Sequence, residues 1–211
     1  MTTARGPDGR ARCAWPSTDE MRSYHDEDWG TPTRDDRRHF RFLVLESAQS
    51  GLSWSLVWRK RDGYRKAFAD FDPKKVARFD ARRIERLLLD PGIVRNRLKV
   101  TSAVRNAKAF LAIQREFGSF DAYIRGFAPK RSRAPRRLED LPARTEGSEA
   151  LAKDLAKRGF RFLGPVVMYS HMQAVGVVND HVVGCFRRAE IERLRVERLR
   201  VEVSERRAAL P

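Results

Sequence analysis

Apolar side chains recur at helical spacing along most of the chain. Leu43 and Val44, for example, follow Phe40 by three and four residues, which is the repeat of one helix face. The sequence has no long alternation of apolar and polar residues, the pattern of a half-buried strand. The pattern therefore predicts an all-α fold.

Capping residues and helix breakers divide this pattern into separate helices. The helix that begins after Asp35 is expected to end at Gly51, because glycine readily adopts the left-handed conformation of a helix C-cap. Side chains that can cap later helices at their N-termini are Ser53, Asp72, Asp80 and Ser119. The helices expected from these signals span 53–72, about 94–117 and 148–157. Pro165 is a good first-turn residue, and the apolar helix after it is expected in the core.

The two ends of the chain differ from its middle. Residues 1–11 are predicted to form a flexible tail, and 12–186 a single domain. In the remainder, 187–211, the unit ERLRV recurs after five residues, a spacing that fits neither a helix face nor a strand face. We expect this segment to be a basic, partly helical or disordered tail exposed to solvent.

The composition is that of a globular protein with a very basic surface. The 211 residues include 44 Lys and Arg against 28 Asp and Glu, a formal net charge of +16, and 41% of them are hydrophobic. This content excludes a mainly disordered chain, and the positive excess favours a polyanionic partner such as nucleic acid. Charge runs are also often merely solvated.

The cysteine count and the apolar segments indicate a compartment. Two cysteines are too few for a disulfide scaffold. The longest uncharged stretch, 162–179, contains proline, glycine and polar residues, which disfavours a membrane span. We therefore expect a cytoplasmic protein that does not interact with membranes.

Each cysteine has a histidine near it in the sequence. Cys13 precedes His25, and His181 precedes Cys185 by four positions, which would place that second pair on one side of a helical turn. Two cysteines and two histidines form a common closed tetrahedral zinc site, with no position left for a reactive water. The alternative is two buried, inert cysteines and two ordinary histidines. Of the other histidines, His39 is expected to face solvent.

Glu46 lies on a helix that is apolar on nearly every side. His171 lies on the separate apolar helix after Pro165, and we assign this histidine to the core. A buried carboxylate needs a partner or a chemical task. Aromatic walls around one carboxylate would suit a nucleobase, because the base offers a π face and purines offer amino donors. The aromatic candidates are Trp15, Tyr24, Trp29 and Trp54. The alternative is a glutamate paired with an arginine or a backbone donor, among aromatics of the core.

The segment 81–104 reads as a helix, a tight turn at Gly92 and a second helix. Such a hairpin can present backbone N–H groups and a helix N-terminus to phosphate. Cations nearby are Arg95, Arg97 and Lys99, and a less specific group in the loop 128–147 consists of Lys130, Arg131, Arg133, Arg136 and Arg137. An ordinary helical connection is the alternative.

Ordered motifs extend from about Arg12 to Cys185. They are Cys13-Ala14-Trp15, YHDEDWG at 24–30, LESAQSGLSW at 45–54, KRDGYRKAF at 60–68, FDPKKVA at 71–77, DPGIVRNRLK at 90–99, KRGFRFLGP at 157–165 and YSHMQAVGVVNDHVVGC at 169–185. Together they closely resemble the bacterial DNA-3-methyladenine glycosylase I family, of the helix-hairpin-helix DNA glycosylase superfamily.

This resemblance implies an activity and a fold. It implies a monofunctional base-excision-repair enzyme that hydrolyses the N-glycosidic bond of 3-methyladenine in alkylated double-stranded DNA, leaving an abasic site. The chain would be a cytoplasmic, nucleoid-associated monomer with the helix-hairpin-helix glycosylase fold. The rival interpretations are a non-catalytic DNA-binding protein of the same fold and a strand-cutting lyase.

The resemblance also implies roles for particular residues. It implies one structural zinc ion that clips the N- and C-terminal segments together, bound by Cys13, His25, His181 and Cys185. It implies base recognition by Glu46, in a pocket lined by Tyr24, Trp54 and Trp15. The turn with Gln49, Gly51 and Leu52 is a candidate wedge for the gap left by an extruded nucleotide.

The chain departs from the family pattern at three places. The hairpin lacks the second glycine of the commoner superfamily turn. Asp121 is the nearest candidate for the superfamily's catalytic aspartate, although it is equally natural in the first turn of a helix. Met21 stands where some relatives carry a pocket tyrosine, and the ERLRV tail lies outside the resemblance.

Overall fold

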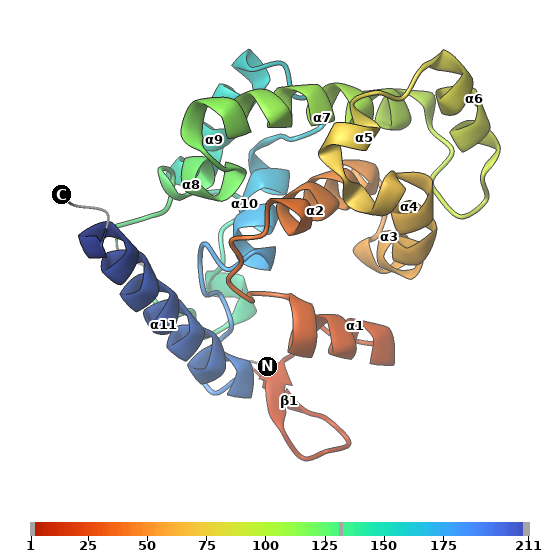
Figure 1. The fold of residues 1–211 in the computed structure, drawn as a ribbon. Helices are drawn as coiled ribbons and strands as arrows, with labels where there is room; N and C mark the ends of the chain where they lie inside the picture. Colours follow the sequence, from red (N-terminus) through yellow and green to blue (C-terminus); the bar gives the residue numbers. More distant parts are fainter. Residues whose placement is uncertain (1–2, 131–132, 209–211) are drawn as a thin grey trace. The chain divides into compact units, whose positions relative to one another are not determined.

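The computed structural model describes residues 3–130 and 133–208, with side chains as far as Val201, and is mostly helical (Figure 1). Its helices are α1 (Asp19–Ser23), η1 (Tyr24–Asp28), α2 (Asp36–Gln49), α3 (Trp54–Arg59), α4 (Arg61–Ala67), η2 (Ala69–Phe71), α5 (Pro73–Val76), α6 (Ala81–Leu89), α7 (Arg97–Phe117), α8 (Phe120–Arg125), η3 (Leu138–Asp140), α9 (Glu146–Lys157), α10 (Pro165–Ala174) and α11 (Phe186–Ala208). Its strands are β1 (Thr3–Arg5) and β2 (Ala11–Cys13). The expected helical fold is thus confirmed, apart from this one hairpin.

The chain divides into two compact units. One, which we call the terminal unit, runs from the N-terminus to Pro32, includes Pro129–Pro142 and resumes at Met172. The other, the central unit, consists of Thr33–Ala128 and Ala143–His171. The single domain predicted for 12–186 stays a prediction.

The N-terminal segment is not the loose tail that its sequence suggested. Strands β1 and β2 pair antiparallel, with Thr3 opposite Cys13. The Arg12 guanidinium bridges Asp8 of the connecting loop and Asp26 of η1, with nitrogen–oxygen distances of 2.6 and 2.7 Å. Strands of three residues are too short to show an alternating pattern, which is why the sequence did not reveal them.

The C-terminal segment is helical as far as Ala208 and is more ordered at its start than expected. Helix α11 begins directly after Cys185, and its Ile191 is fully buried. Arg195 donates to the backbone carbonyl of Val177 at 3.3 Å. The first turns of α11 therefore belong to the core of the terminal unit. Throughout 3–130 and 133–208, every helix is too short or too polar to cross a lipid bilayer.

Helix α2 forms the centre of the central unit. Phe40, Phe42 and Leu43 have no exposed surface, and α2 packs against α3, α7 and α8. Asp35 caps its N-terminus, and the Asp36 carboxylate accepts hydrogen bonds from the Gln114 amide and from two backbone N–H groups at the start of α8. These bonds tie the start of α2 to α7 and α8.

The predicted N-caps are confirmed. In each case a side-chain oxygen accepts a backbone N–H of the first helical turn, at Ser53 for α3, Asp72 for α5, Asp80 for α6 and Ser119 for α8. The continuous helix expected over 53–72 is wrong, because the backbone at Lys60 leaves helical geometry and separates α3 from α4. The long helix α7 begins at Arg97, three residues later than expected, where Asn96 caps it.

Helix α4 holds the turn between α6 and α7. Lys60 donates to the carbonyl of Pro91 at 2.6 Å, and the Tyr64 hydroxyl accepts the N–H of Val94 at 3.1 Å. Between them, Gly63 lies so close to Gly92 that a Cβ on Gly63 would stand 2.2 Å from the Gly92 carbonyl oxygen. The motif KRDGY therefore acts as the support of the hairpin turn.

We expect a Gly63→Ala substitution to lower the free energy of unfolding by about 1–3 kcal/mol, because backbone must move to admit the new methyl group. In an unobstructed helix interior, the same substitution would gain about 1 kcal/mol. Denaturant titration measures the effect. Gly164→Ala is the matched control, since nothing lies within 4 Å of its new methyl group. Equal stability of the two variants would show that the close approach is not a constraint.

Candidate active site and metal site

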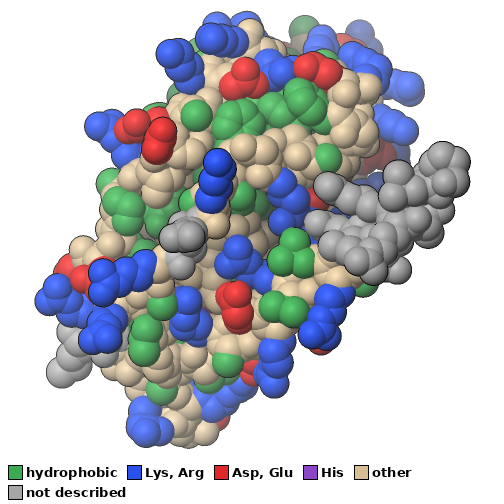
Figure 2. All heavy atoms as spheres, turned by 90° about the vertical axis from the view of Figure 1, so that its left-hand side faces the viewer, with side chains coloured by type: hydrophobic (Ala, Val, Ile, Leu, Met, Phe, Trp, Pro, Cys, Tyr) green, Lys and Arg blue, Asp and Glu red, His purple; other side chains and the backbone are tan. Residues whose placement is uncertain are grey.

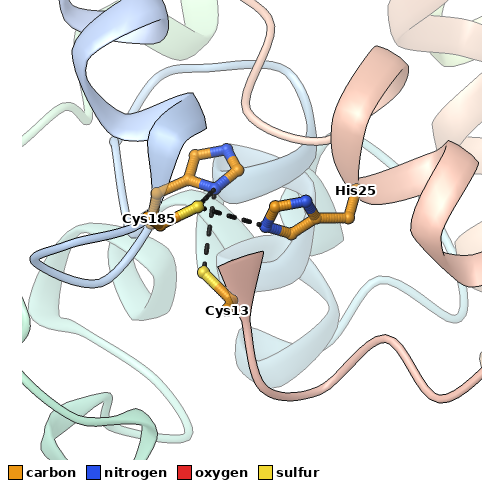
Figure 3. A group of neighbouring side chains, drawn as sticks. Cys13, His25 and Cys185 are labelled. Carbon is orange, nitrogen blue, oxygen red and sulfur yellow. Dashed lines mark hydrogen bonds between the residues drawn. The ribbon is translucent and has the colours of Figure 1, made fainter. Parts of the chain in front are cut away.

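Cys13, His25, His181 and Cys185 form a buried cluster in the terminal unit. Each offers one ligand atom, and these four atoms lie within 4.8 Å of one another. The Sγ atom of Cys185 lies 3.5 Å from both His25 Nε2 and His181 Nδ1. In Figure 3 the labelled side chains from three separate segments converge on one point. The grouping that the spacing suggested is thus present, and it could hold a metal ion.

The last two members of the cluster are presented by a turn, and the expectation of a shared helical turn is wrong. His181 and Cys185 flank a tight turn in which the Cys185 N–H donates to the Val182 carbonyl at 3.0 Å. Gly184 adopts a φ of +92°, a conformation that side-chain-bearing residues rarely take. The turn also directs the Val182 N–H to Cys13 Sγ, at 3.4 Å.

Oxygen acceptors orient both histidines of the cluster. His25 Nδ1 lies 2.8 Å from an Asp26 carboxylate oxygen, and His181 Nε2 lies 3.2 Å from the Trp29 carbonyl oxygen. Each ring therefore donates its outer N–H to oxygen and points its other nitrogen at the sulfur atoms. Oxygen acceptors of this kind orient metal-binding histidines in proteins.

The sulfur atoms share charge unequally. Contact with Cys13 lowers the pKa of Cys185 far below its usual range, and the two imidazoles lower it further. Contact with Cys185, together with burial, raises the pKa of the Cys13 thiol. A thiolate beside two imidazoles is the donor set that zinc prefers, so the residues present fit that ion.

Three of the predicted base-binding aromatics gather around this cluster. The Trp15 ring contacts those of Tyr24, His25 and Trp29 edge-on, with centroid distances of 5.3 to 6.0 Å. Trp29 lies 4.5 Å from the His181 ring and is 8% exposed, so it packs directly on a member of the cluster. Met21 is also buried. The role of these aromatics in base binding stays a prediction.

Glu46 lies in the central unit, on α2, and is only 3% exposed. Its Oε2 atom is 2.8 Å from Nδ1 of His171, which lies on α10 and is fully buried. Burial raises the pKa of Glu46, and the charge and hydrogen bond of His171 oppose that rise. The partner is thus neither of the two that the sequence suggested. The sequence did offer one signal for this partner, because His171 is a polar residue in a mostly apolar helix.

The position of His39 contradicts the sequence-based expectation. It was expected to face solvent, but it is fully buried. Its Nδ1 atom is 3.2 Å from His171 Nε2, and its Nε2 atom is 3.3 Å from a carboxylate oxygen of Asp121. Helix α2 is covered on nearly all sides, so a position outside its main apolar stripe is also buried. Asp121, the candidate for a catalytic aspartate, is engaged with His39.

Trp54 and the turn before it lie at the end of α2. The Trp54 ring stacks near Phe42, at a centroid distance of 6.4 Å. In the turn, Gly51 adopts a φ of +77° and Leu52 is 38% exposed, which keeps Leu52 available as the predicted wedge. Lys99 donates to two backbone carbonyls at the end of α2, at 2.7 and 2.5 Å. The ammonium group of Lys99 therefore holds the turn.

The other predicted DNA-binding residues differ in how exposed and engaged they are. Arg97 forms a two-pronged ion pair with Glu85, at 2.5 and 2.8 Å, whereas Arg95 is exposed at the tip of the hairpin. The Gly92 N–H donates to the Asp90 carboxylate at 2.7 Å. Lysine and arginine side chains are spread over the face shown in Figure 2. In the basic loop, Arg131 lies outside the described residues.

Comparison with known proteins gives consistent results. The family model described as methyladenine glycosylase matches residues 15–188. DNA-3-methyladenine glycosylase 1 of Escherichia coli (strain K12) is 43% identical over 178 residues, covering 82% of this chain and 95% of that protein. DNA-3-methyladenine glycosylase of Haemophilus influenzae is 40% identical over 178 residues, covering 82% and 96%.

Solved structures agree with this result. A crystal structure of 3-methyladenine DNA glycosylase I has a TM-score of 0.79 at 42% identity, covering 83% of this chain and 98% of that one. A variant of 3-methyladenine DNA glycosylase I in complex with 3-methyladenine has a TM-score of 0.77 at 34% identity, covering 81% and 92%.

Proposed function

The chain belongs to the methyladenine glycosylase family, and from this premise we infer that it is a monofunctional DNA glycosylase of base-excision repair. It hydrolyses the N-glycosidic bond of 3-methyladenine in alkylated DNA and leaves an abasic site. The observation that carries this conclusion is the match of the family model over 15–188, together with a relative that binds 3-methyladenine.

Glu46 is the residue that we assign to base recognition and catalysis. Its Oε2 atom is engaged by His171, so Oε1 is the atom to accept a hydrogen bond from the amino group of the base. A 3-methylated adenine in DNA is cationic and departs as a neutral base, so the leaving group needs no proton from an acid. A buried carboxylate would instead stabilise the positive charge that develops on the sugar.

Aromatic rings would hold the extruded base. Stacking of a base on an aromatic side chain contributes about 1–3 kcal/mol, enough to offset much of the cost of extrusion. Trp54 and Trp15 are half-buried and keep part of their surface available, which supports a stacking role. Tyr24 and Trp29 are buried in the terminal unit, so in our proposal they support the ring of Trp15, which they contact.

We expect Glu46→Gln to reduce release of 3-methyladenine by a factor of about 100 to 1000, because the amide keeps the shape but loses the negative charge. Chromatography of bases released from methylated duplex DNA measures this rate. The control is Glu20→Gln, at an exposed carboxylate on α1, which should retain full activity. A wild-type protein that binds this DNA without releasing base would favour the non-catalytic alternative.

We propose that the cluster of Cys13, His25, His181 and Cys185 binds one zinc ion with a structural role. The four side chains would complete a tetrahedral shell, with no position left for a reactive water. The two outer hydrogen bonds of the histidines and the close approach of the four ligand atoms support this assignment. Zinc would neutralise thiolate charge inside the terminal unit and join its two ends.

Purified protein should therefore contain one zinc ion per chain and no thiol that reacts with Ellman's reagent. A Cys185→Ser variant should lose the zinc and much of the stability of the terminal unit, since structural zinc contributes about 10–16 kcal/mol of binding free energy in peptide systems. His39→Gln is the matched control, as a buried histidine outside the cluster, and should keep the metal. Protein that is purified without zinc and shows two reactive thiols would contradict the assignment.

We also propose that a monomer contacts double-stranded DNA in the bacterial cytoplasm. The hairpin tip with Gly92 and Arg95 would lie on phosphates, and the turn of Gln49, Gly51 and Leu52 would fill the gap in the duplex. Lys99, which donates to the end of α2, and Arg97, which pairs with Glu85, would add positive potential without direct phosphate contacts. The exposure of Arg95 and Leu52 supports this arrangement.

We expect Arg95→Ala to flatten the dependence of log K for duplex DNA on log salt concentration by about 0.9, the value for one lost phosphate contact. Fluorescence anisotropy at several salt concentrations gives the slope. The control is Arg115→Ala, an exposed arginine near the other end of α7, whose slope should equal that of the wild type. A wild-type slope for Arg95→Ala would remove the hairpin tip from the interface.

A further inference from the structure

Four buried polar side chains form a continuous chain in the central unit. It runs from Glu46 to His171 at 2.8 Å, from His171 to His39 at 3.2 Å, and from His39 to Asp121 at 3.3 Å. The four side chains come from α2, α8 and α10, and none is more than 5% exposed. Polar groups buried together at this density must be matched donor to acceptor.

The far end of the chain determines the direction of its hydrogen bonds. Arg125 donates from Nε to both carboxylate oxygens of Asp121, at 3.1 and 3.2 Å, which holds Asp121 as an anion. An ionised carboxylate only accepts hydrogen bonds, so the Nε2 atom of His39 must carry a proton and donate it.

The same logic extends to the second histidine. Burial lowers the pKa of His39 to about 4, so its ring is neutral at physiological pH. A neutral imidazole protonated at Nε2 has an acceptor at Nδ1. Nε2 of His171 must therefore carry a proton and donate it to His39.

One more proton lies between His171 and Glu46. With Nε2 of His171 already protonated, its Nδ1 atom either receives a proton from a Glu46 carboxylic acid or donates one to a Glu46 carboxylate. In both arrangements the pair holds one shared proton and has no net charge. A buried pair of this kind avoids the large desolvation cost of an isolated carboxylate.

We propose that His171 is a positioning residue for the glycosylase reaction, held by His39 and Asp121, which keeps Glu46 as a hydrogen-bonded carboxylate facing the base. This inference rests on the function proposed above for Glu46. The proton shared with His171 offsets the charge of Glu46, which would be costly to bury alone. It also fixes Oε2, which leaves Oε1 oriented as the acceptor.

Other charged groups around α2 make their hydrogen bonds away from Glu46, although the charge of Asp36 acts on His39. Asp36, on α2 itself, accepts from Gln114 and from the start of α8, and Lys99 of α7 donates to carbonyls at the C-terminal end of α2. Among the remaining elements packed on α2, Arg61 of α4 lies over the Trp58 ring of α3, and Asp70 of η2 pairs with Arg37 of α2. The titration of Glu46 is therefore governed by burial and His171.

The test is the pH dependence of 3-methyladenine release under single-turnover conditions. In His171→Phe, which replaces one ring by another, the midpoint of the acidic limb should rise by about one to three pH units, since a neighbouring cation is lost. The variant should therefore lose rate on the acidic side of the profile, by more than the wild type at the same pH, and recover it as the pH rises. His171→Gln, which can still donate a hydrogen bond, should shift the midpoint less.

A matched pair at His39 tests the rest of the chain. A glutamine can donate to Asp121 and accept from His171, so His39→Gln should keep the wild-type midpoint. His39→Leu removes the acceptor and should shift the midpoint in the same direction as His171→Phe. Thermal unfolding of each variant separates these shifts from loss of folded protein, because unfolding lowers the amplitude of the profile without moving its midpoint.

Nitrogen-15 NMR of the histidine rings gives a readout that is independent of activity. It should find His39 protonated only at Nε2 and His171 protonated at Nε2 in the wild-type protein. A His171 ring without a proton on Nε2, or an unmoved midpoint in His171→Phe, would overturn this inference alone. A wild-type protein that releases no 3-methyladenine would instead overturn the proposed function, and the ring protonation could still be scored.

Discussion

The near-complete removal of Glu46 from water is the constraint on which the rest of the central unit depends. An isolated carboxylate at such a depth is unstable, so it needs a positive or proton-sharing partner. His171 fills that role from α10, and its other nitrogen then needs a partner of its own. His39 is that partner, and it in turn contacts Asp121. The series ends there, because Arg125 of α8 donates to the Asp121 carboxylate. One buried acid thus determines the polar residues of three helices.

The central unit uses backbone contacts in a similar way to place its hairpin. Gly63 of α4 approaches Gly92 more closely than any side chain would allow, and Lys60 and Tyr64 bond the chain on both sides of that contact. A short exposed turn has little apolar packing of its own. Here the contact of two glycines and the hydrogen bonds of Lys60 and Tyr64 hold the turn instead. The tip with Arg95 is then presented on a supported turn, which suits the contact with phosphates that we propose for it.

How far the sequence could predict these features depended on how local each signal was. N-caps such as Ser53 and Asp80 act within one helical turn and were predicted correctly. The four cluster residues stood out because cysteine and histidine are rare in this chain. His39 was misplaced because periodicity along α2 does not reveal how many neighbours cover it. The partner of Glu46 depends on a contact between distant segments, which spacing alone cannot give.

The composition of the terminal unit has a consequence for the order of events during biosynthesis. Cys13 and His181 stand 168 positions apart in the chain, yet their side chains belong to one cluster. At about 5–20 residues per second, the first half of the cluster waits on the order of ten seconds or more before the second half leaves the ribosome. During that interval the N-terminal hairpin, η1 and a reactive thiol must persist without their partners. Completion of this unit is therefore a late, nearly post-translational step, and a chain that stops before Cys185 would never reach it.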